Sequence, residues 1–344
     1  MNIIIVGCGN VGHLHLKCYD KLKKSMDINI VGFVDINYIH LKKFESKYYE
    51  LFGKENKPLC SQQLKDISNK IDISDSVIDI CTPNDAHYPC AKEACALGAK
   101  NILIEKPLAS TLSDAIKIEK LDANIAVAEN YIYSHTTKMI KKIIQSNGFK
   151  PRFVSTDFSK DRRQDALNGR GCVKGKHPHL FNIEIPHQLA IVNYLFGEPE
   201  KINGAWAKSL PINNKTFRSH GQGGVHLSHK NDIVSYSFSC LNGYQQLHKR
   251  HRGIRIYCEN GARIIGQYPL GGSDTSFNSV IILHNNGDGV KKYELKDDNM
   301  LETLSNILDC FDKGKTPLTN VAFGKKIVQI INSITNSKEH VLNE

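Results

Sequence analysis

The first 130 residues alternate between short apolar runs and amphipathic segments. The apolar runs lack a helical period, which is typical of strands buried on both faces of a parallel sheet. Predicted strands lie near residues 3–6, 28–34, 77–81, 101–105 and 125–128, and predicted helices near residues 11–22, 37–50, 87–97 and 112–121. This alternation predicts a doubly wound parallel sheet, and therefore an α/β fold.

Beyond Tyr131 the alternation stops. Several predicted strands are now separated by turns rich in Gly and Asn, as in antiparallel sheets. Strands are expected near residues 152–158, 201–208, 233–240, 253–258, 262–267 and 278–283, and helices near 134–146, 184–196, 299–313 and 320–336. We expect two domains, residues 1–130 and residues 131–344, of which the second is α+β with an open, mostly antiparallel sheet.

Three glycines follow the first predicted strand at G-x-G-x-x-G spacing, namely Gly7, Gly9 and Gly12. Such a pattern alone also fits an ordinary turn. Here it joins a strand to a helix, where glycines let the backbone approach a pyrophosphate and the first helical turn offers unpaired N–H groups. Asn10 and Val11 begin that turn, so the stretch predicts a dinucleotide-binding site.

Asp35 ends the second predicted strand, close to the ~20-residue offset expected for the carboxylate that binds an adenosine ribose. A carboxylate in this place repels a 2′-phosphate, so NAD is favoured over NADP. Lys42 and Lys43 lie near enough in sequence to keep NADP as an alternative.

Composition excludes several other classes of protein. The net charge of +10 would suit a nucleic-acid partner, but the lysines are dispersed, and the basic cluster at residues 248–252 also fits a solvated strand face. No apolar stretch approaches the ~20 residues that span a bilayer, so no membrane partner and a cytoplasmic location are expected. The ten cysteines lack C-x-x-C pairs and are expected to be reduced thiols.

Two further motifs make a family recognisable. The sequence TPNDAH occupies residues 82–87 and EKPL occupies residues 105–108. Together with the glycine motif and Asp35, they resemble the Gfo/Idh/MocA family of oxidoreductases. The resemblance implies an N-terminal Rossmann domain that binds NAD(P), and a C-terminal sheet that often serves in oligomerisation, so a homo-oligomer is expected.

The resemblance also implies roles for residues of both motifs. Lys106 would exchange a proton with the substrate oxygen, because it ends a parallel strand at the edge where such sheets bind ligands. The peptide bond before Pro107 is often cis in the family. The residues implied to lie along the nicotinamide half of the cofactor are Thr82, Pro83, Asn84, His87, Glu105 and Lys106.

The family's second signature, Asp-x-Gly-x-His, is incomplete in this chain. Residues 183–187 read Ile-Glu-Ile-Pro-His, so the aspartate is missing. Glu184 lies three residues before His187, on one face of a helix. We expect His187 to act as general base or hydroxyl anchor, with Glu184 as its partner, although a core histidine also fits. His177 and His179 raise a metal-site alternative, but no zinc template matches and no metal is expected.

The substrates that the resemblance implies are sugars, inositols, sugar acids or nucleotide-linked sugars, and the general basicity of the chain suits an anionic substrate. The expected activity is that of an NAD(P)-dependent dehydrogenase or reductase acting on a secondary alcohol or ketone. Two alternatives stay open. One is transient oxidation for net non-redox chemistry, such as glycoside cleavage or epimerisation, and the other is a non-catalytic dinucleotide sensor.

Overall fold

The computed structural model describes residues 1–161, 180–212, 215–241, 250–270, 277–285, 289–336 and 341–342. The chain divides into two compact units, Met1–Asn130 with Met300–Gln329, and Tyr131–Asn299 with Ile330–Glu344. The sequence pattern did not indicate that residues 300–329 group with the N-terminal unit. As a division of function, residues 1–130 and 131–344 stay a prediction.

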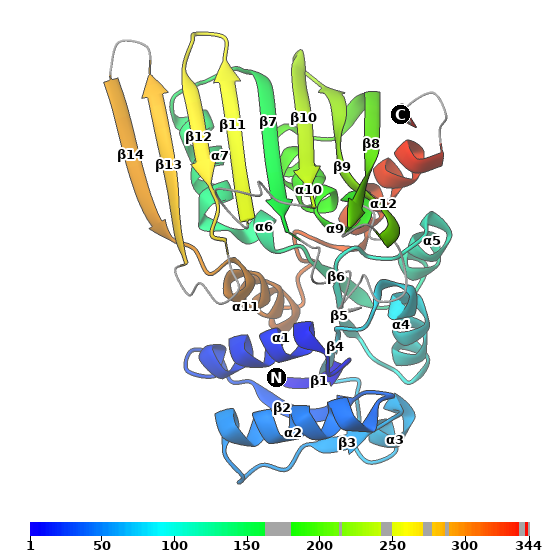
Figure 1. The fold of residues 1–344 in the computed structure, drawn as a ribbon. Coiled ribbons are helices and arrows are strands. Elements are labelled where there is room, and N and C mark those ends of the chain that lie inside the picture. Colours follow the sequence, from blue (N-terminus) through cyan, green and yellow to red (C-terminus); the bar gives the residue numbers. More distant parts are fainter. Residues whose placement is uncertain are drawn as a thin grey trace. The chain divides into compact units, whose positions relative to one another are not determined.

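The N-terminal unit contains a six-stranded parallel sheet, as predicted (Figure 1). Its strands are β1 (Asn2–Val6), β2 (Asn29–Val34), β3 (Leu59–Ser61), β4 (Ser76–Ile80), β5 (Asn101–Glu105) and β6 (Asn124–Ala128). Their order in the sheet is β3-β2-β1-β4-β5-β6, so the chain reverses direction across the sheet between β1 and β4. Doubly wound sheets bind ligands at this switch point, outside the carboxyl ends of the strands.

Helices connect these strands. They are α1 (Asn10–Leu22), α2 (Tyr38–Phe52), α3 (Leu64–Ser68), the 3-10 helix η1 (Asn84–Ala86), α4 (His87–Ala96) and α5 (Leu112–Glu119). Side-chain caps fix several starts. The Asn37 side chain accepts hydrogen bonds from two backbone N–H groups of α2, and Thr111 accepts one from Asp114 in α5. The predicted helices are therefore confirmed to within a few residues.

Two late helices, α11 (Asn299–Asp312) and α12 (Val321–Asn336), precede the last described strand, β15 (Val341–Leu342). The segment between them is anchored on β6. The Thr319 hydroxyl donates to the Val127 carbonyl at 2.7 Å, and Ala126 forms a β-bridge with Asn320. A Cβ on Gly324 would lie 2.6 Å from the Val127 side chain, so glycine allows the start of α12 to approach β6 closely.

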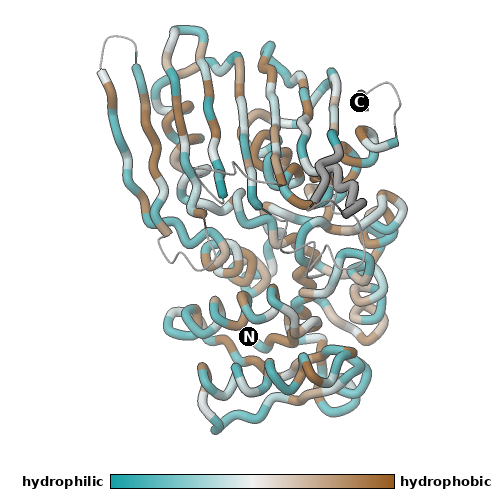
Figure 2. Tube along the Cα trace, in the orientation of Figure 1, coloured by the Kyte–Doolittle hydropathy of each residue, from teal (hydrophilic) through white to brown (hydrophobic). Residues whose placement is uncertain are grey.

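The core of the N-terminal unit explains the apolar runs. Ile3, Ile4 and Ile5 have no exposed surface, because helices cover both faces of the sheet. Figure 2 shows hydrophobic residues following the strands. Asp79 is a polar exception in the centre of β4, and it is also fully buried.

The C-terminal unit contains a nine-stranded, mostly antiparallel sheet, again as predicted. Its order is β14-β13-β12-β11-β7-β10-β9-β8-β15, with β7 and β10 pairing in parallel at its centre. The strands are β7 (Pro151–Lys160), β8 (Pro199–Ile212), β9 (Lys215–His229), β10 (Ile233–Cys240), β11 (Arg250–Cys258), β12 (Arg263–Gln267), β13 (Asn278–Asn285), β14 (Gly289–Lys296) and β15 (Val341–Leu342).

Helices α7 (His135–Ser146) and α10 (Ile185–Phe196) pack on one face of this sheet (Figure 1). Two short helices, α6 (Asn130–Tyr133) and α9 (Leu180–Ile183), lie near them in the chain. Burial alternates along β10, from buried Ile233 and Ser235 to half-exposed Val234 and Tyr236. The sheet therefore has one buried and one partly exposed face.

Two sequence expectations about chemistry and membranes can be compared with the described residues. All nine cysteines among them are free thiols, as expected from their scattered spacing. Within the described ranges, no helix combines the length and the apolar character that crossing a bilayer requires.

Candidate cofactor and active site

The three motif glycines each meet a different requirement. Gly7 has φ +103°, and a Cβ there would lie 2.7 Å from the Cys81 carbonyl carbon at the end of β4. A Cβ on Gly12 would lie 2.3 Å from the Gly7 carbonyl oxygen. Gly9 instead faces open space, with no atom within 4 Å of an added Cβ. The turn is thus tight on the protein side and open on the side where a pyrophosphate would approach.

Helix α1 begins at Asn10 with Gly9 in the N-cap position and no side chain capping its first N–H groups. The first turn of a helix offers such groups, and the positive end of the helix dipole, to an anion. Asp35 lies at the end of β2, where one carboxylate oxygen accepts from the Cys8 N–H and the other from the Asn37 N–H, both at 2.8 Å. The residues present therefore fit the pyrophosphate and ribose of a dinucleotide.

Of the two lysines that keep NADP as an alternative, only Lys42 has a carboxylate partner among the described residues. Lys42 pairs with Glu45 at 2.9 Å. Lys43 lines a shallow hollow of ≈ 360 Å³ with His13 and Lys17. The exposed His40 ring lies beside the Asp35 carboxylate, with Nδ1 3.7 Å from Oδ2. This arrangement favours the unphosphorylated cofactor.

The turn after β4 carries Thr82, Pro83 and Asn84, and leads through η1 into α4. Pro83 is exposed at the start of η1. His87 is fully buried at the first position of α4, with Nδ1 3.0 Å from the Pro107 carbonyl oxygen and Nε2 3.1 Å from the Thr82 carbonyl oxygen. His87 therefore joins the turn after β4 to the turn after β5.

The turn after β5 presents Lys106, which is half-buried. The peptide bond between Lys106 and Pro107 is cis, as the resemblance implied. The Lys106 backbone N–H donates to Glu105 Oε2 at 3.2 Å, and Glu105 is 8% exposed. The backbone of this turn is thus held on one side by Glu105 and on the other by His87.

A buried polar network lies behind these two turns, and it was not predicted. His15, on α1, has Nδ1 2.8 Å from Asp79 Oδ2 and Nε2 2.9 Å from Glu105 Oε1. The Tyr19 hydroxyl donates to the same Asp79 oxygen at 2.7 Å. His15, Tyr19 and Asp79 have no exposed surface. The signals that could have revealed the network are an aspartate inside an apolar strand and two polar residues four apart on α1.

The protonation of the network follows from its charges. Burial by itself lowers the pKa of His15, but the Asp79 carboxylate, and then Cys81, outweigh burial and raise the pKa well above its usual range. Each ring nitrogen of His15 faces a carboxyl oxygen, an arrangement in which an imidazolium can donate to both. Burial raises the pKa of Cys81 to about 12, and the neighbouring Asp79 charge adds to this, so Cys81 stays a thiol.

His15, Asp79 and Cys81 also form the one group of potential metal donors found among the described residues. Their donor atoms lie within 4.8 Å of one another. A structural zinc site normally has four ligands. These three donors already hydrogen-bond one another, with Cys81 Sγ 3.4 Å from His15 Nδ1, so the geometry is that of a hydrogen-bonded network.

In the C-terminal unit, His187 and Glu184 lie at the start of α10. Glu184 is the N-cap residue, Pro186 opens the helix, and both Glu184 and His187 are buried. The His187 ring packs edge-on against Tyr131 at 4.9 Å between centroids, and the Arg252 guanidinium lies 5.5 Å from the same Tyr131 ring. His187 thus lies in an aromatic and basic cluster.

Some expected residues cannot be placed. His177, His179, His248 and Lys249 lie outside the described residues, so the metal alternative at His177 and His179 stays a prediction. Arg250 and Arg252 of the basic cluster lie on β11, and both guanidinium groups donate to the Leu270 carbonyl, at 3.1 and 3.0 Å. Part of this cluster is therefore engaged by the protein's own backbone.

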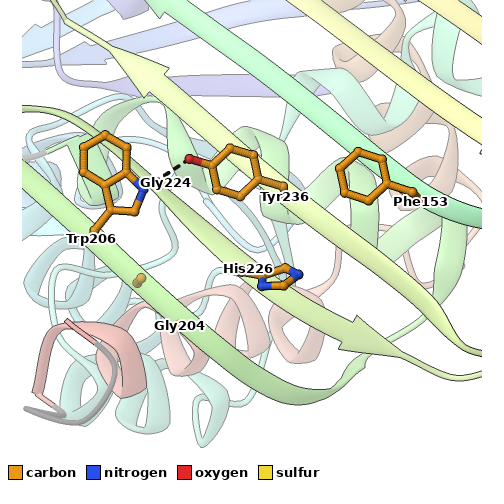
Figure 3. Close-up of a pocket in the computed structure, with 7 residues that line it drawn as sticks. Phe153, Gly204, Trp206, Gly224, His226 and Tyr236 are labelled. Atoms are coloured by element: carbon orange, nitrogen blue, oxygen red, sulfur yellow. Dashed lines mark hydrogen bonds between the residues drawn. The ribbon is translucent and has the colours of Figure 1, made fainter. Parts of the chain in front are cut away.

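A second hollow, of ≈ 400 Å³, lies on the partly exposed face of the C-terminal sheet. Figure 3 shows Trp206 of β8, Tyr236 of β10 and Phe153 of β7, with Gly224 beside the Trp206–Tyr236 hydrogen bond. The indole N–H of Trp206 donates to the Tyr236 hydroxyl at 3.1 Å. The hollow is lined mainly by aromatic rings and glycines, which distinguishes it from the polar N-terminal edge.

Comparison with protein families matches residues 1–126 to the Gfo/Idh/MocA model, which is described as an oxidoreductase family with an NAD-binding Rossmann fold. The matched range contains the glycine motif, Asp35 and Lys106. A search of curated proteins found no match.

Solved structures of low sequence identity share the fold over nearly the whole chain. A 3-ketoreductase from Actinomadura kijaniata, in complex with NADP and TDP-benzene, has 11% identity and a TM-score of 0.79, covering 100% of this chain and 98% of its own. An oxidoreductase from Agrobacterium radiobacter, with NAD⁺, L-tartaric acid and magnesium, has 15% identity and a TM-score of 0.76, covering 98% and 96%. UDP-N-acetylglucosamine 3-dehydrogenase from Acidithiobacillus ferrooxidans has 15% identity and a TM-score of 0.71, covering 97% and 96%.

Proposed function

We propose, on the premise that residues 1–126 belong to the Gfo/Idh/MocA family of NAD-binding oxidoreductases, that the chain oxidises or reduces a secondary alcohol or ketone of a sugar-like substrate. The nicotinamide of the bound cofactor would supply or accept the hydride. The observation that carries the proposal is Lys106, which follows β5 directly: its backbone N–H donates to Glu105, and His87 contacts the carbonyl of the next residue, Pro107.

The proposed cofactor residues act in two groups. Gly7, Gly9 and Gly12, with the N–H groups of Asn10 and Val11, accommodate the pyrophosphate, and Asp35 accepts hydrogen bonds from the ribose. At the other end of the cofactor, Thr82, Pro83, Asn84 and His87 line the nicotinamide half, with Glu105 and Lys106 beside it.

Lys106 is the proposed proton-transfer residue. Oxidation of a secondary alcohol requires the hydroxyl proton to leave, and reduction of a ketone requires a proton to arrive. An amine within reach of that oxygen can do either. His187 is the second proposed proton carrier, with Glu184 as its partner, since imidazole exchanges protons near neutral pH.

The substrate class is supported by two of the similar structures. One is a 3-ketoreductase with a bound TDP-benzene, and another is named for UDP-N-acetylglucosamine. A nucleotide-linked sugar would also suit the chain's net charge of +10. Sugars, inositols and sugar acids remain in the proposed range.

The test is NADH turnover with a panel of nucleotide sugars, sugars and sugar acids, in the wild type and two variants. We expect Lys106→Ala to lower kcat by roughly 10²–10⁴-fold, the usual contribution of a positioned acid or base. The matched control is Lys100→Ala, because Lys100 is exposed and precedes the same strand. Wild-type turnover in Lys106→Ala, with cofactor binding intact, would refute the assigned role.

The same panel separates the two alternatives. A cofactor that stays bound and recycles, with product formed but no net change in NADH, would indicate transient oxidation for net non-redox chemistry. Cofactor binding without turnover of any compound would favour a dinucleotide sensor.

A homo-oligomer through the C-terminal sheet is the second part of the proposal. Phe153, which is 39% exposed, lines the hollow that contains Trp206 (Figure 3), and its ring centroid lies 6.0 Å from that of Tyr257, which is 41% exposed. Exposed aromatic surface of this kind is stabilised by a partner. Sedimentation should show an oligomer that Phe153→Glu dissociates and that Val290→Glu, on strand β14, leaves intact.

A further inference from the structure

The His15 ring is the centre of a chain of hydrogen bonds that ends at the backbone of Lys106. Tyr19 and His15 donate to Asp79 on β4, and His15 also donates to Glu105 at the end of β5. The second oxygen of Glu105 accepts from the Lys106 N–H. Each group is at most 8% exposed up to Glu105.

We propose that His15 is a positioning residue for Lys106: its imidazolium joins Asp79 to Glu105 and thereby fixes the carboxylate that holds the Lys106 backbone. This inference rests on the proposed function, because it concerns the position of Lys106, the proposed proton-transfer residue. It assigns no contact between His15 and the substrate.

The geometry of Glu105 explains why a cation is needed behind it. A nearly buried carboxylate is costly unless it is paired. Its two oxygens have different partners, the His15 ring and the Lys106 N–H, so the orientation of the carboxylate is set by both. Asp79 balances the second side of the imidazolium and is itself held by the Tyr19 hydroxyl.

His15 and His87, which lie at the same edge of the sheet, have different kinds of partner. His87 holds the turn through the Pro107 carbonyl and can do so as a neutral ring. Loss of His15 would leave the turn attached through His87, but the Glu105 carboxylate would keep only the Lys106 N–H as a partner. A change in the environment of the Lys106 amine is therefore expected without loss of the fold's connectivity.

The experiment uses the full-length protein without substrate. Its lysines are dimethylated with ¹³C-formaldehyde, and the Lys106 methyl resonance is assigned by its loss in Lys106→Arg. We expect His15→Gln and Glu105→Gln each to shift this resonance, and the double variant to shift it no further, because both act through one chain. His13→Gln, two residues earlier on the same helix, is the matched control and leaves it in place. An unshifted resonance in His15→Gln, or additive shifts, would overturn the proposal.

A second measurement guards against variants that fail to fold. In the wild type at pH 8, long-range ¹H–¹⁵N spectra should show both ring nitrogens of His15 protonated. A neutral His15 ring would overturn the proposal without any substitution. The outcome is independent of the proposed function: Lys106→Ala with full turnover would refute catalysis by Lys106, whereas the resonance reports only whether His15 positions it.

Discussion

Two histidines of the N-terminal unit are both fully buried, yet their surroundings are opposite. His15, in the middle of α1, lies between the carboxylates of Asp79 and Glu105. His87, at the start of α4, lies between the carbonyls of Thr82 and Pro107. The pKa of His15 is raised well above its usual range, whereas burial lowers the pKa of His87 despite its carbonyl partners.

The difference shows that burial alone does not decide the charge of a histidine. Desolvation opposes the imidazolium in both places, and only neighbouring full charges overcome it. A cation at His15 can orient a carboxylate with each of its two N–H groups, while a neutral ring at His87 has one N–H and donates to only one of its two carbonyl neighbours. The edge of the sheet that presents Lys106 contains both kinds of histidine, one beside carboxylates and one beside carbonyl groups.

The largest expected difference is in stability after loss of each ring. His15→Leu leaves two buried carboxylates without their cation and should lower the free energy of unfolding by about 3–5 kcal/mol. His87→Leu leaves carbonyls without a donor and should cost about 1–3 kcal/mol. Urea unfolding of both variants measures this. Equal losses of unfolding free energy would show that the charges around His15 add no more stability than the neutral contacts of His87.

A smaller effect is expected from Tyr19→Phe. This substitution removes the hydroxyl that donates to Asp79 at 2.7 Å and leaves the ring in place. Because the acceptor is charged, the free energy of unfolding should fall by about 1.5–3 kcal/mol. Tyr48→Phe, in the aromatic cluster of α2, is a suitable comparison. If both substitutions lower the free energy of unfolding equally, the hydrogen bond from Tyr19 to Asp79 adds no measurable stability.

The smallest effect per step is the pH dependence, and it has opposite signs at the two rings. His15 has a raised folded-state pKa, so its stabilisation is complete below the unfolded value of ~6.5 and is lost as pH rises through the folded pKa. His87 has a lowered folded-state pKa, so stability is lost as pH falls below ~6.5. Each contributes at most about 1.4 kcal/mol per pH unit.

Urea unfolding of the wild type, His15→Gln and His87→Gln, at pH values below and above ~6.5, measures how the free energy of unfolding changes with pH at each ring. The groups facing His15 are Tyr19, Asp79, Cys81 and Glu105, and Glu105 also acts on His87. The difference between wild type and His15→Gln should shrink at alkaline pH. The difference between wild type and His87→Gln should shrink at acid pH. The same sign for both would contradict the comparison.

The N-terminal fold could be predicted because its strands are continuous apolar runs. Strand β3 was missed because it has only three residues, Leu59–Ser61. In the C-terminal unit, β9 was missed for another reason. Glycines are depleted in strands, yet Gly223 and Gly224 lie in β9, where a Cβ would meet the Trp206 carbonyl at 2.3 Å and the Tyr236 hydroxyl at 2.7 Å. Close packing and turns both require glycine, and sequence alone does not separate them.

The candidate site was accessible to prediction only where spacing carries the chemistry. The glycine motif and Asp35 have fixed offsets, so their places followed from the sequence. The network around His15 did not, because its members are 64 and 90 residues apart from His15 and meet only through strand order. Strand β14 was also missed, since its residues are mostly exposed and polar.

The most direct test of the account is binding of NADH to the glycine turn, measured by titration calorimetry. Gly9→Val should fold normally, because no atom lies within 4 Å of the added Cβ, yet it fills the space required by the pyrophosphate. Gly204→Val, in equally open space on the C-terminal sheet, is the control. We expect wild type and Gly204→Val to bind alike and Gly9→Val to bind at least about 100-fold more weakly, a loss of ~2.7 kcal/mol. Equal binding in all three, or no binding to the wild type, would contradict the account.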